Sequence, residues 1–159
     1  MARRTKDGFG FRPVSRRRKL PGMSDTIFRY SQRVTYADCA PGNHVYYANY
    51  LLFLEAARGE FFRTIGITFL QLQNEGTVFP VVECRLRYKA PARYDEVIVV
   101  ELWVTAAERV RLNFAYRILD ATGNLLVEAE TQHVCTGLDE KAKRLPEELI
   151  VRTRAYLRT

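Results

Sequence analysis

The sequence is poor in the residues that build metal sites and disulfide frameworks. It has only three cysteines and two histidines in 159 residues, and no two cysteines have the C-x-x-C spacing. Three unclustered cysteines argue against both a zinc site and a set of disulfides, and they lead us to expect a cytoplasmic protein. Cys84 and Cys135 lie within strand patterns, where we expect small buried side chains, whereas Cys39 lies beside a turn with no base paired to it.

Long apolar runs and glycine-rich loops are missing as well. No stretch approaches the ~20 apolar residues of a membrane-spanning helix. No apolar segment follows the basic N-terminal residues, as one would in a secretory signal. The sequence also has no glycine-rich phosphate loop and no flavin motif. We therefore expect no membrane association, no metal site and no bound cofactor.

Positive charge is concentrated at the start of the chain. Residues 1–22 hold eight Lys and Arg against one acid, so the totals of 25 bases and 18 acids leave 17 of each in residues 23–159. Few apolar residues and no regular period predict that residues 1–22 are a disordered basic extension. The run Arg16-Arg17-Arg18-Lys19 is the only part for which we would expect a nucleic-acid partner. The alternative, which we prefer, is an upstream extension of the reading frame with Met23 as the true start.

The remaining residues 23–159 are enough for one domain. Loose alternation over residues 27–37 predicts a half-buried strand. Apolar residues then recur at spacings of three and four, which predicts a helix over residues 49–65 that Gly66 ends. The flanks of this helix are also apolar, so we expect other elements to wrap it.

Strands follow the helix in close succession. The pattern predicts them near residues 78–90, 96–106, 109–119 and 125–137, with a short amphipathic helix after Pro146. Short links between them predict an antiparallel meander, and the strand at 97–104, apolar on both faces, is expected to be central. The expected fold class is α+β, with one long helix wrapped by a curved, five-stranded, mostly antiparallel sheet.

The segment directly before the predicted helix is the most informative. It reads Asp38-Cys-Ala-Pro-Gly-Asn-His44-Val-Tyr46-Tyr47-Ala-Asn49-Tyr50. It places a carboxylate, an imidazole and a turn beside backbone N–H groups that have no partners within the helix. Such a helix start can hold a polarised carbonyl oxygen. With a carboxylate or imidazole within reach, hydrolysis of an acyl group is the first hypothesis.

Two motifs carry a family resemblance. They are Asp-x-x-x-x-x-His-Val-x-Tyr-x-x-Tyr-Leu-x-x-x-Glu-x-Ala-Arg, from Asp38 to Arg58, and Pro91-Ala-Arg-Tyr-Asp-Glu before a strand. Together they resemble the 4-hydroxybenzoyl-CoA thioesterase family of hotdog-fold acyl-CoA hydrolases. The resemblance covers residues 27 to 155. It implies a single hotdog domain, an acyl-CoA substrate that brings its own coenzyme A, and a homodimer or homotetramer with active sites between subunits.

One family position differs. Where the family usually carries its catalytic aspartate, the chain has Ala40, and a methyl group can neither attack a thioester nor activate water. A protein that binds acyl thioesters without turnover is therefore the alternative to a hydrolase. A hotdog dehydratase is disfavoured because the chain has no Gly-His-Phe-Pro type segment to supply the histidine.

The resemblance makes the N–H of Tyr47 the group that polarises the thioester carbonyl. His44, Asp38 or Glu55 would then activate water. His44 is the first choice because the unperturbed pKa of histidine lies close to working pH. Asp38 could instead hold loop N–H groups, and Glu55 could form an ion pair with Arg58, three residues further on.

Other residues are candidates for substrate binding. The same resemblance implies that Tyr46, Tyr47, Asn49 and Tyr50 could line the acyl pocket, although core packing is favoured for Tyr50. Lys89 and Arg93 flank predicted strand ends and could meet the phosphates of coenzyme A. His133 shares a predicted strand face with apolar residues, which indicates a hydrogen-bonded, partly buried histidine rather than a catalytic one.

Overall fold

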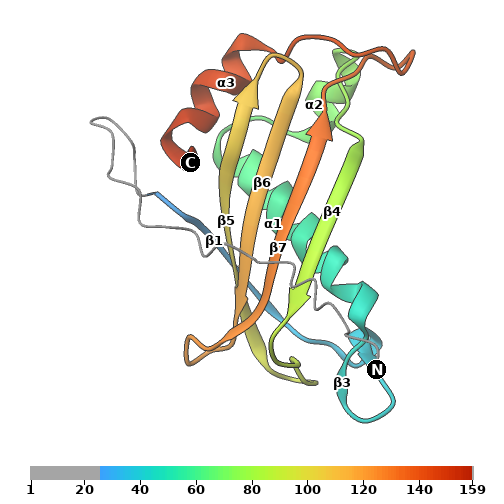
Figure 1. The fold of residues 1–159 in the computed structure, drawn as a ribbon, viewed down its shortest axis with the longest axis vertical. Helices are drawn as coiled ribbons and strands as arrows, with labels where there is room; N and C mark the ends of the chain where they lie inside the picture. The colour runs from blue at the N-terminus through green and yellow to red at the C-terminus, as the bar shows by residue number, and fades with distance from the viewer. Residues whose placement is uncertain (1–25, 159) are drawn as a thin grey trace, which may run out of the picture.

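The computed structural model describes residues 26–158, in which one long helix lies against one face of a twisted sheet (Figure 1). The strands are β1 (Phe28–Arg33), β2 (Cys39–Ala40), β3 (His44–Val45), β4 (Val81–Tyr88), β5 (Val97–Glu108), β6 (Arg111–Leu119) and β7 (Leu125–Val134). The helices are α1 (Tyr50–Thr64), α2 (Phe69–Asn74) and α3 (Glu147–Thr153). The expected α+β architecture is confirmed, and the predicted basic extension over residues 1–22 lies outside the described residues.

The five long strands are antiparallel and follow the order β1-β5-β6-β7-β4. Two expectations are therefore wrong. The central strand is β6 rather than the strand at 97–104, and the meander includes only β5, β6 and β7, because β4 pairs with β7 at the far edge. The length of the link between β4 and β5 does not decide whether these two strands are neighbours. The eight residues 89–96 can span about 26 Å, whereas three strand spacings need only about 14 Å.

The core lies between α1 and the inner face of the sheet. Of the apolar stripe predicted for α1, Tyr50, Leu54, Ala57 and Phe61 are buried there and Ile65 is half-buried. Phe53 and Phe62 from the flanks of the stripe are buried as well. The Phe61 ring packs edge-on against Phe114 of β6 at 5.9 Å and against Tyr156 at 5.0 Å. Burying each such side chain stabilises the fold by about 1.5–3 kcal/mol. The helix ends as predicted, because Gly66 adopts a φ of +79° that other residues rarely take.

The outer face of the sheet carries a row of alternating charges that we call the charge ladder. In register across the five strands, Arg29 faces Glu101, Glu101 faces Arg117, Arg117 faces Glu128, and Glu128 faces Arg87. Glu101 is buried and meets Arg29 at 2.8 Å and Arg117 at 2.6 Å. Burial raises the pKa of this carboxyl, but the two arginines outweigh burial and hold the pKa below its usual value. The ladder explains how β5 can be covered on both faces.

The edge strand β4 corrects one expectation. Cys135 is buried as predicted, but Cys84 on β4 is exposed. The strand hydrogen-bonds to β7 on one side and has no strand beyond it among residues 26–158. Its apolar pattern therefore does not indicate burial within a single chain. None of the helices in the described part of the chain is long and apolar enough to cross a bilayer.

Candidate active site at the start of helix α1

A small hairpin forms the loop before α1. Strands β2 and β3 pair so that Ala40 lies opposite His44, and Gly42 and Asn43 take positive φ angles of 98° and 57° in the turn between them. The loop is tied to the helix start through one carbonyl. The Tyr46 N–H and the Asn49 side-chain amide both donate to the Asp38 carbonyl, at 2.9 and 3.0 Å. The hairpin thus holds His44 close to the beginning of α1.

The chain enters α1 through a 3-10 turn over Tyr47–Asn49. Tyr46 is extended, with φ −61° and ψ 132°, so the turn begins at Tyr47. The N–H of the first residue of such a turn has no carbonyl partner within it, and it lies at the positive end of the helix dipole. The Tyr88 hydroxyl donates to the Tyr47 carbonyl at 2.9 Å and fixes the turn against β4.

A cleft of about 560 Å³ opens at this helix start. It is lined by Ala40, His44, Val45, Tyr46, Tyr47, Tyr50, Tyr88, Lys89, Ala90 and Pro91. Its volume lies within the range of small-molecule sites, about 300–1,000 Å³. The structure therefore brings five of the predicted site residues together: His44, Tyr46, Tyr47, Tyr50 and Lys89.

Three predicted residues lie outside the lining and hold the loop. The Asp38 carboxylate accepts hydrogen bonds from the N–H and the hydroxyl of Thr35, both at 2.7 Å. Asn49 is tied to the Asp38 carbonyl, and the Arg93 guanidinium donates to the Asn43 carbonyl at 3.2 Å. Of the two roles considered for Asp38, this geometry favours the one that secures the loop.

Tyr50 joins the cleft to the core. It is 2% exposed, and its hydroxyl accepts a hydrogen bond from the Ala92 N–H at 2.9 Å. Burial raises the pKa of this phenol above its usual value, so it stays protonated at neutral pH. Tyr50 is thus a packing residue, as favoured from the sequence, with one side turned toward the cleft.

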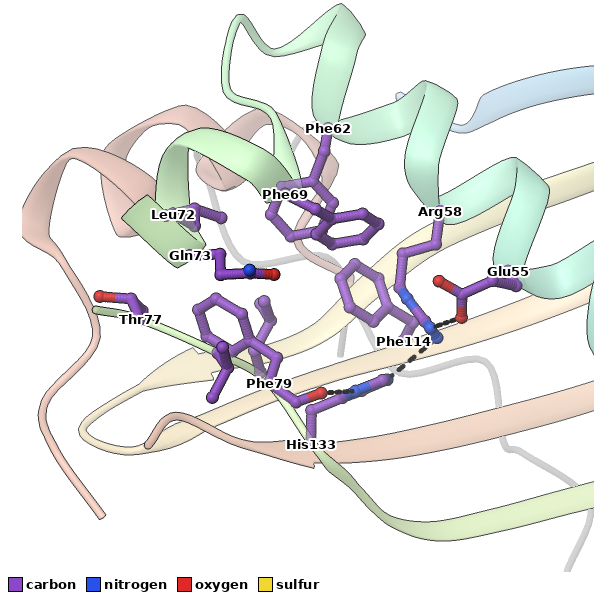
Figure 2. Close-up of a pocket in the computed structure, with 12 residues that line it drawn as sticks. Glu55, Arg58, Phe62, Phe69, Leu72, Gln73, Thr77, Phe79, Phe114 and His133 are labelled. Carbon is purple, nitrogen blue, oxygen red and sulfur yellow. Dashed lines mark hydrogen bonds and ion pairs between the residues drawn. The ribbon is translucent and has the colours of Figure 1, made fainter. Parts of the chain in front are cut away.

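Glu55 belongs to a second cavity, further along α1. This cavity of about 160 Å³ lies between α1, α2 and the inner face of the sheet (Figure 2). The Glu55 carboxylate forms the expected ion pair with Arg58. The two partners differ in burial: the Glu55 side chain is 58% exposed and that of Arg58 only 9%. Arg58 is therefore a buried cation that needs further partners.

His133 supplies one of them. Its Nδ1 lies 3.2 Å from the Phe79 carbonyl, which can only accept, so Nδ1 carries the hydrogen. Its Nε2 then accepts from Arg58 at 3.3 Å and from the Thr131 hydroxyl at 2.9 Å. Burial and the charge of Arg58 lower the pKa of His133 to about 4. His133 is neutral and hydrogen-bonded, as the sequence predicted.

The pairing of Arg58 with His133 was missed from the sequence. The two residues are 75 positions apart, and Arg58 had been considered only as a partner for Glu55. A signal was present, because Arg58 lies on the buried side of α1 between Ala57 and Phe61. A charge on a buried stripe needs a hydrogen-bonding partner from another element. No group of three His, Cys, Asp or Glu side chains in residues 26–158 is arranged to hold a metal ion.

Comparison with known proteins places the chain among thioesterases. The family model of the thioesterase-like superfamily matches residues 34–152. Acyl-CoA thioester hydrolase YbgC of Escherichia coli O6:H1 is 36% identical over 129 residues, covering 80% of this chain and 96% of that protein. Putative acyl-CoA thioesterase YneP of Bacillus subtilis is 30% identical over 102 residues, covering 64% and 74%.

A solved structure gives the same result. Slr0204, a 1,4-dihydroxy-2-naphthoyl-CoA thioesterase from Synechocystis, superposes with a TM-score of 0.76 at 26% identity, covering 80% of this chain and 96% of that one. These similarities confirm the hotdog fold that the motifs implied. The chain belongs to the thioesterase-like superfamily.

Proposed function

We propose that the protein hydrolyses an acyl-CoA thioester to the free acid and coenzyme A, which enters as part of the substrate. One observation carries this proposal: Tyr47, the first residue of the helix start, His44 and Lys89 all line a single cleft. The relatives named as acyl-CoA thioester hydrolases support the same reaction type. Thioester hydrolysis needs an amide donor for the carbonyl oxygen and a base for water, and the cleft offers both.

The reaction would proceed by attack of water on the thioester carbonyl carbon. The Tyr47 N–H would stabilise the negative charge that develops on the carbonyl oxygen, and one such donor contributes about 3 kcal/mol. His44 would take a proton from the attacking water as the carbon–oxygen bond forms. It would return the proton to the leaving sulfur as the carbon–sulfur bond breaks.

His44 is the proposed base because the alternatives are occupied or remote. Ala40 has no ionisable group, and the Asp38 carboxylate is engaged by Thr35. Glu55 lies eight residues beyond Tyr47, so a rise of about 1.5 Å per residue puts it ~12 Å along the helix from the Tyr47 N–H. His44 is exposed and lines the cleft.

Lys89 is the proposed contact for the phosphates of coenzyme A. It lines the cleft, and its ammonium lies 3.4 Å from the Glu128 carboxylate on the surface. An exposed pair of this kind is weak and exchanges readily with another anion. Tyr46 and Tyr47 would cover the acyl group from the open side of the cleft.

We also propose that the protein acts as a homodimer joined along β4. The outer edge of β4 is unpaired within residues 26–158, and an exposed strand edge is a template for another strand. Its large apolar side chains are about half exposed: Val81 50%, Val82 60% and Tyr88 48%. A two-fold axis at Cys84 would set Glu83 opposite the partner's Arg85. Light scattering should give about twice the 18.4 kDa of one chain, and a monomer would contradict this arrangement.

The function is tested by thiol release from a panel of aromatic and aliphatic acyl-CoA thioesters. We expect His44→Ala to lower kcat by about 10²- to 10⁴-fold, whereas Asp38→Asn and Glu55→Gln keep most of the activity. Full turnover by His44→Ala would refute the proposed base. Tight binding of acyl-CoA with no thiol release from any substrate would identify a binding protein instead. In that case Ala40→Asp should create activity.

A further inference from the structure

Four tyrosines line the cleft at the start of α1, and one of them comes from the sheet. Tyr46, Tyr47 and Tyr50 belong to the helix start, whereas Tyr88 is the last residue of β4. Strand β4 ends beside the helix start, where the Tyr88 hydroxyl donates to the Tyr47 carbonyl at 2.9 Å (Figure 1). The Tyr50 hydroxyl is bonded instead to the Ala92 N–H. Through Tyr88 the sheet is therefore bonded directly to the backbone of the helix start.

This hydrogen bond fixes one of the two peptide groups that flank the Tyr47 Cα. A peptide group is planar, so a bond to its carbonyl holds the whole plane. The peptide between Tyr46 and Tyr47 carries the Tyr47 N–H, and its carbonyl accepts from the Asn49 N–H at 2.9 Å. The peptide between Tyr47 and Ala48 is held by Tyr88. With both planes fixed, the Tyr47 N–H has a defined direction before any substrate binds.

The Tyr47 N–H itself is left free for a ligand. It donates to no carbonyl or side chain within residues 26–158, and Tyr47 is 62% exposed, so packing does little to hold it. A donor stabilises a developing charge best when it is already aimed at that charge. A misplacement of about 1 Å can cost about 10²-fold in rate. The hydrogen bond from Tyr88 therefore bears on catalysis as well as on the fold.

Tyr88 is suited to holding this carbonyl and not to transferring a proton. Its hydroxyl has a single hydrogen, which is donated to the Tyr47 carbonyl. Burial, and to a lesser extent Cys84 and Tyr47, raise the pKa of the Tyr88 phenol, so the hydroxyl keeps this hydrogen at neutral pH. The Tyr88 ring packs edge-on against Tyr50 at 5.5 Å, which limits its movement.

We propose that Tyr88 is a positioning residue for the hydrolysis proposed above: its hydroxyl holds the backbone at Tyr47 so that the Tyr47 N–H points at the thioester oxygen. This inference rests on the proposed reaction and on the Tyr47 N–H as its oxyanion donor. It adds a requirement that the loop before α1 does not reveal, because the hydroxyl comes from an edge strand 41 residues further along the chain.

The test is Tyr88→Phe, which removes the hydroxyl and keeps the ring. In the thiol-release assay we expect kcat to fall about tenfold with KM nearly unchanged, a smaller loss than the ~10²- to 10³-fold expected when the donor itself is removed. The pH dependence of kcat should match that of the parent, because Tyr88 transfers no proton. A changed pH profile would assign Tyr88 a direct catalytic role and overturn the proposal.

Tyr94→Phe is the matched control. Tyr94 is 50% exposed against 48% for Tyr88, and its hydroxyl makes no hydrogen bond to the helix start, so this variant should keep full activity. The amide of Ala48 belongs to the same peptide group as the Tyr47 carbonyl. Its NMR resonance should therefore shift in Tyr88→Phe and not in Tyr94→Phe, and an unmoved resonance in both would contradict the hydrogen bond.

A double-mutant cycle separates positioning from a general structural role. Tyr47→Pro deletes the donor N–H, so Tyr88→Phe should lower kcat by less than about twofold in that background. An equal loss of kcat in both backgrounds would show that Tyr88 acts independently of the donor. Full activity of Tyr88→Phe in a parent that hydrolyses acyl-CoA would overturn this inference alone. A parent that releases no thiol from any substrate would refute the proposed function, and this role with it.

Discussion

The two cavities along α1 are built in different ways. The cleft at the helix start is open, and its lining comes from two short stretches, residues 40–50 and 88–91. The second cavity is less open, and its lining comes from α1, α2, β6, β7 and the segment before β4. Tyr47 in the first is 62% exposed, whereas His133 in the second is 1% exposed. The first is thus a local motif that the fold displays, and the second exists only when distant segments are assembled.

The largest effect is expected when the backbone donor of the open cleft is removed. Tyr47→Pro deletes the N–H at a position where proline fits, since the first residue of a turn needs no donor and Tyr46 has a ψ of 132°. We expect kcat/KM to fall by about 10²- to 10³-fold in the thiol-release assay, with the fold retained. Tyr47→Ala, which keeps the amide, is the control. Equal activity of the two variants would show that the amide is not the oxyanion donor.

Changes to the buried side chains of the second cavity should instead lower the stability of the fold. Arg58→Met leaves His133 and Glu55 without their shared partner, and we expect the free energy of unfolding in urea to fall by about 2–4 kcal/mol. Arg63→Met is a matched control, because Arg63 pairs with Glu60 at the same spacing on the same helix but is 62% exposed. That change should stay within about 0.5 kcal/mol. Similar losses for both variants would remove the distinction between the buried and exposed pairs.

The neutral histidine predicts a pH dependence of stability. His133 has a pKa of about 4 in the folded state against 6.5 in the unfolded chain, so the unfolded chain binds the additional proton between these values. Stability must therefore fall as pH drops from 6.5 toward 4, by about 2 kcal/mol between pH 7 and pH 5. Urea titrations at both pH values should show this loss. His133→Gln should reduce it, whereas the exposed His44→Gln should leave it in place.

The smallest expected effect separates two cations near the open cleft. Lys89 lines the cleft, whereas Arg93 is bound to the Asn43 carbonyl outside it. Lys89→Ala should raise KM for acyl-CoA about 3- to 5-fold, the effect of losing roughly 1 kcal/mol of charge attraction. The increase should shrink at high salt. A larger KM effect for Arg93→Ala than for Lys89→Ala would indicate that the phosphates of coenzyme A bind beside Arg93 instead.

Much of the fold could be predicted because its elements have clear periods. The apolar stripe of α1 and the stop at Gly66 are local features, and the structure retains both. The order of strands could not be predicted in the same way. Adjacency of β4 and β7 depends on where the chain goes after Tyr88. The short link that follows Tyr88 would allow β4 to lie beside β5 or at the far edge beside β7. Exposure of Cys84 follows from that edge position rather than from its own sequence.

The candidate site residues also divide into those that local sequence predicts and those that depend on the assembled fold. His44, Tyr46 and Tyr47 were predicted together because they are close in sequence and lie beside a recognisable helix start. Whether they act catalytically stays a prediction. The hydrogen bond between Arg58 and His133 could not be predicted, because it requires the register of β7 against the helix packed on the sheet.

The charge ladder gives each strand a sign of charge that restricts which strands can lie beside it. Antiparallel pairing means that β1, β6 and β4 run one way and contribute arginines, whereas β5 and β7 run the other way and contribute glutamates. Two arginine-bearing strands, or the two glutamate-bearing strands, placed side by side in this register would bring like charges together, which is unfavourable. The same rule on the sign of charge applies to a strand from another chain that joins the free edge of β4. The proposed dimer meets this condition, because an axis at Cys84 sets the partner's Val81, and no basic residue, opposite Arg87.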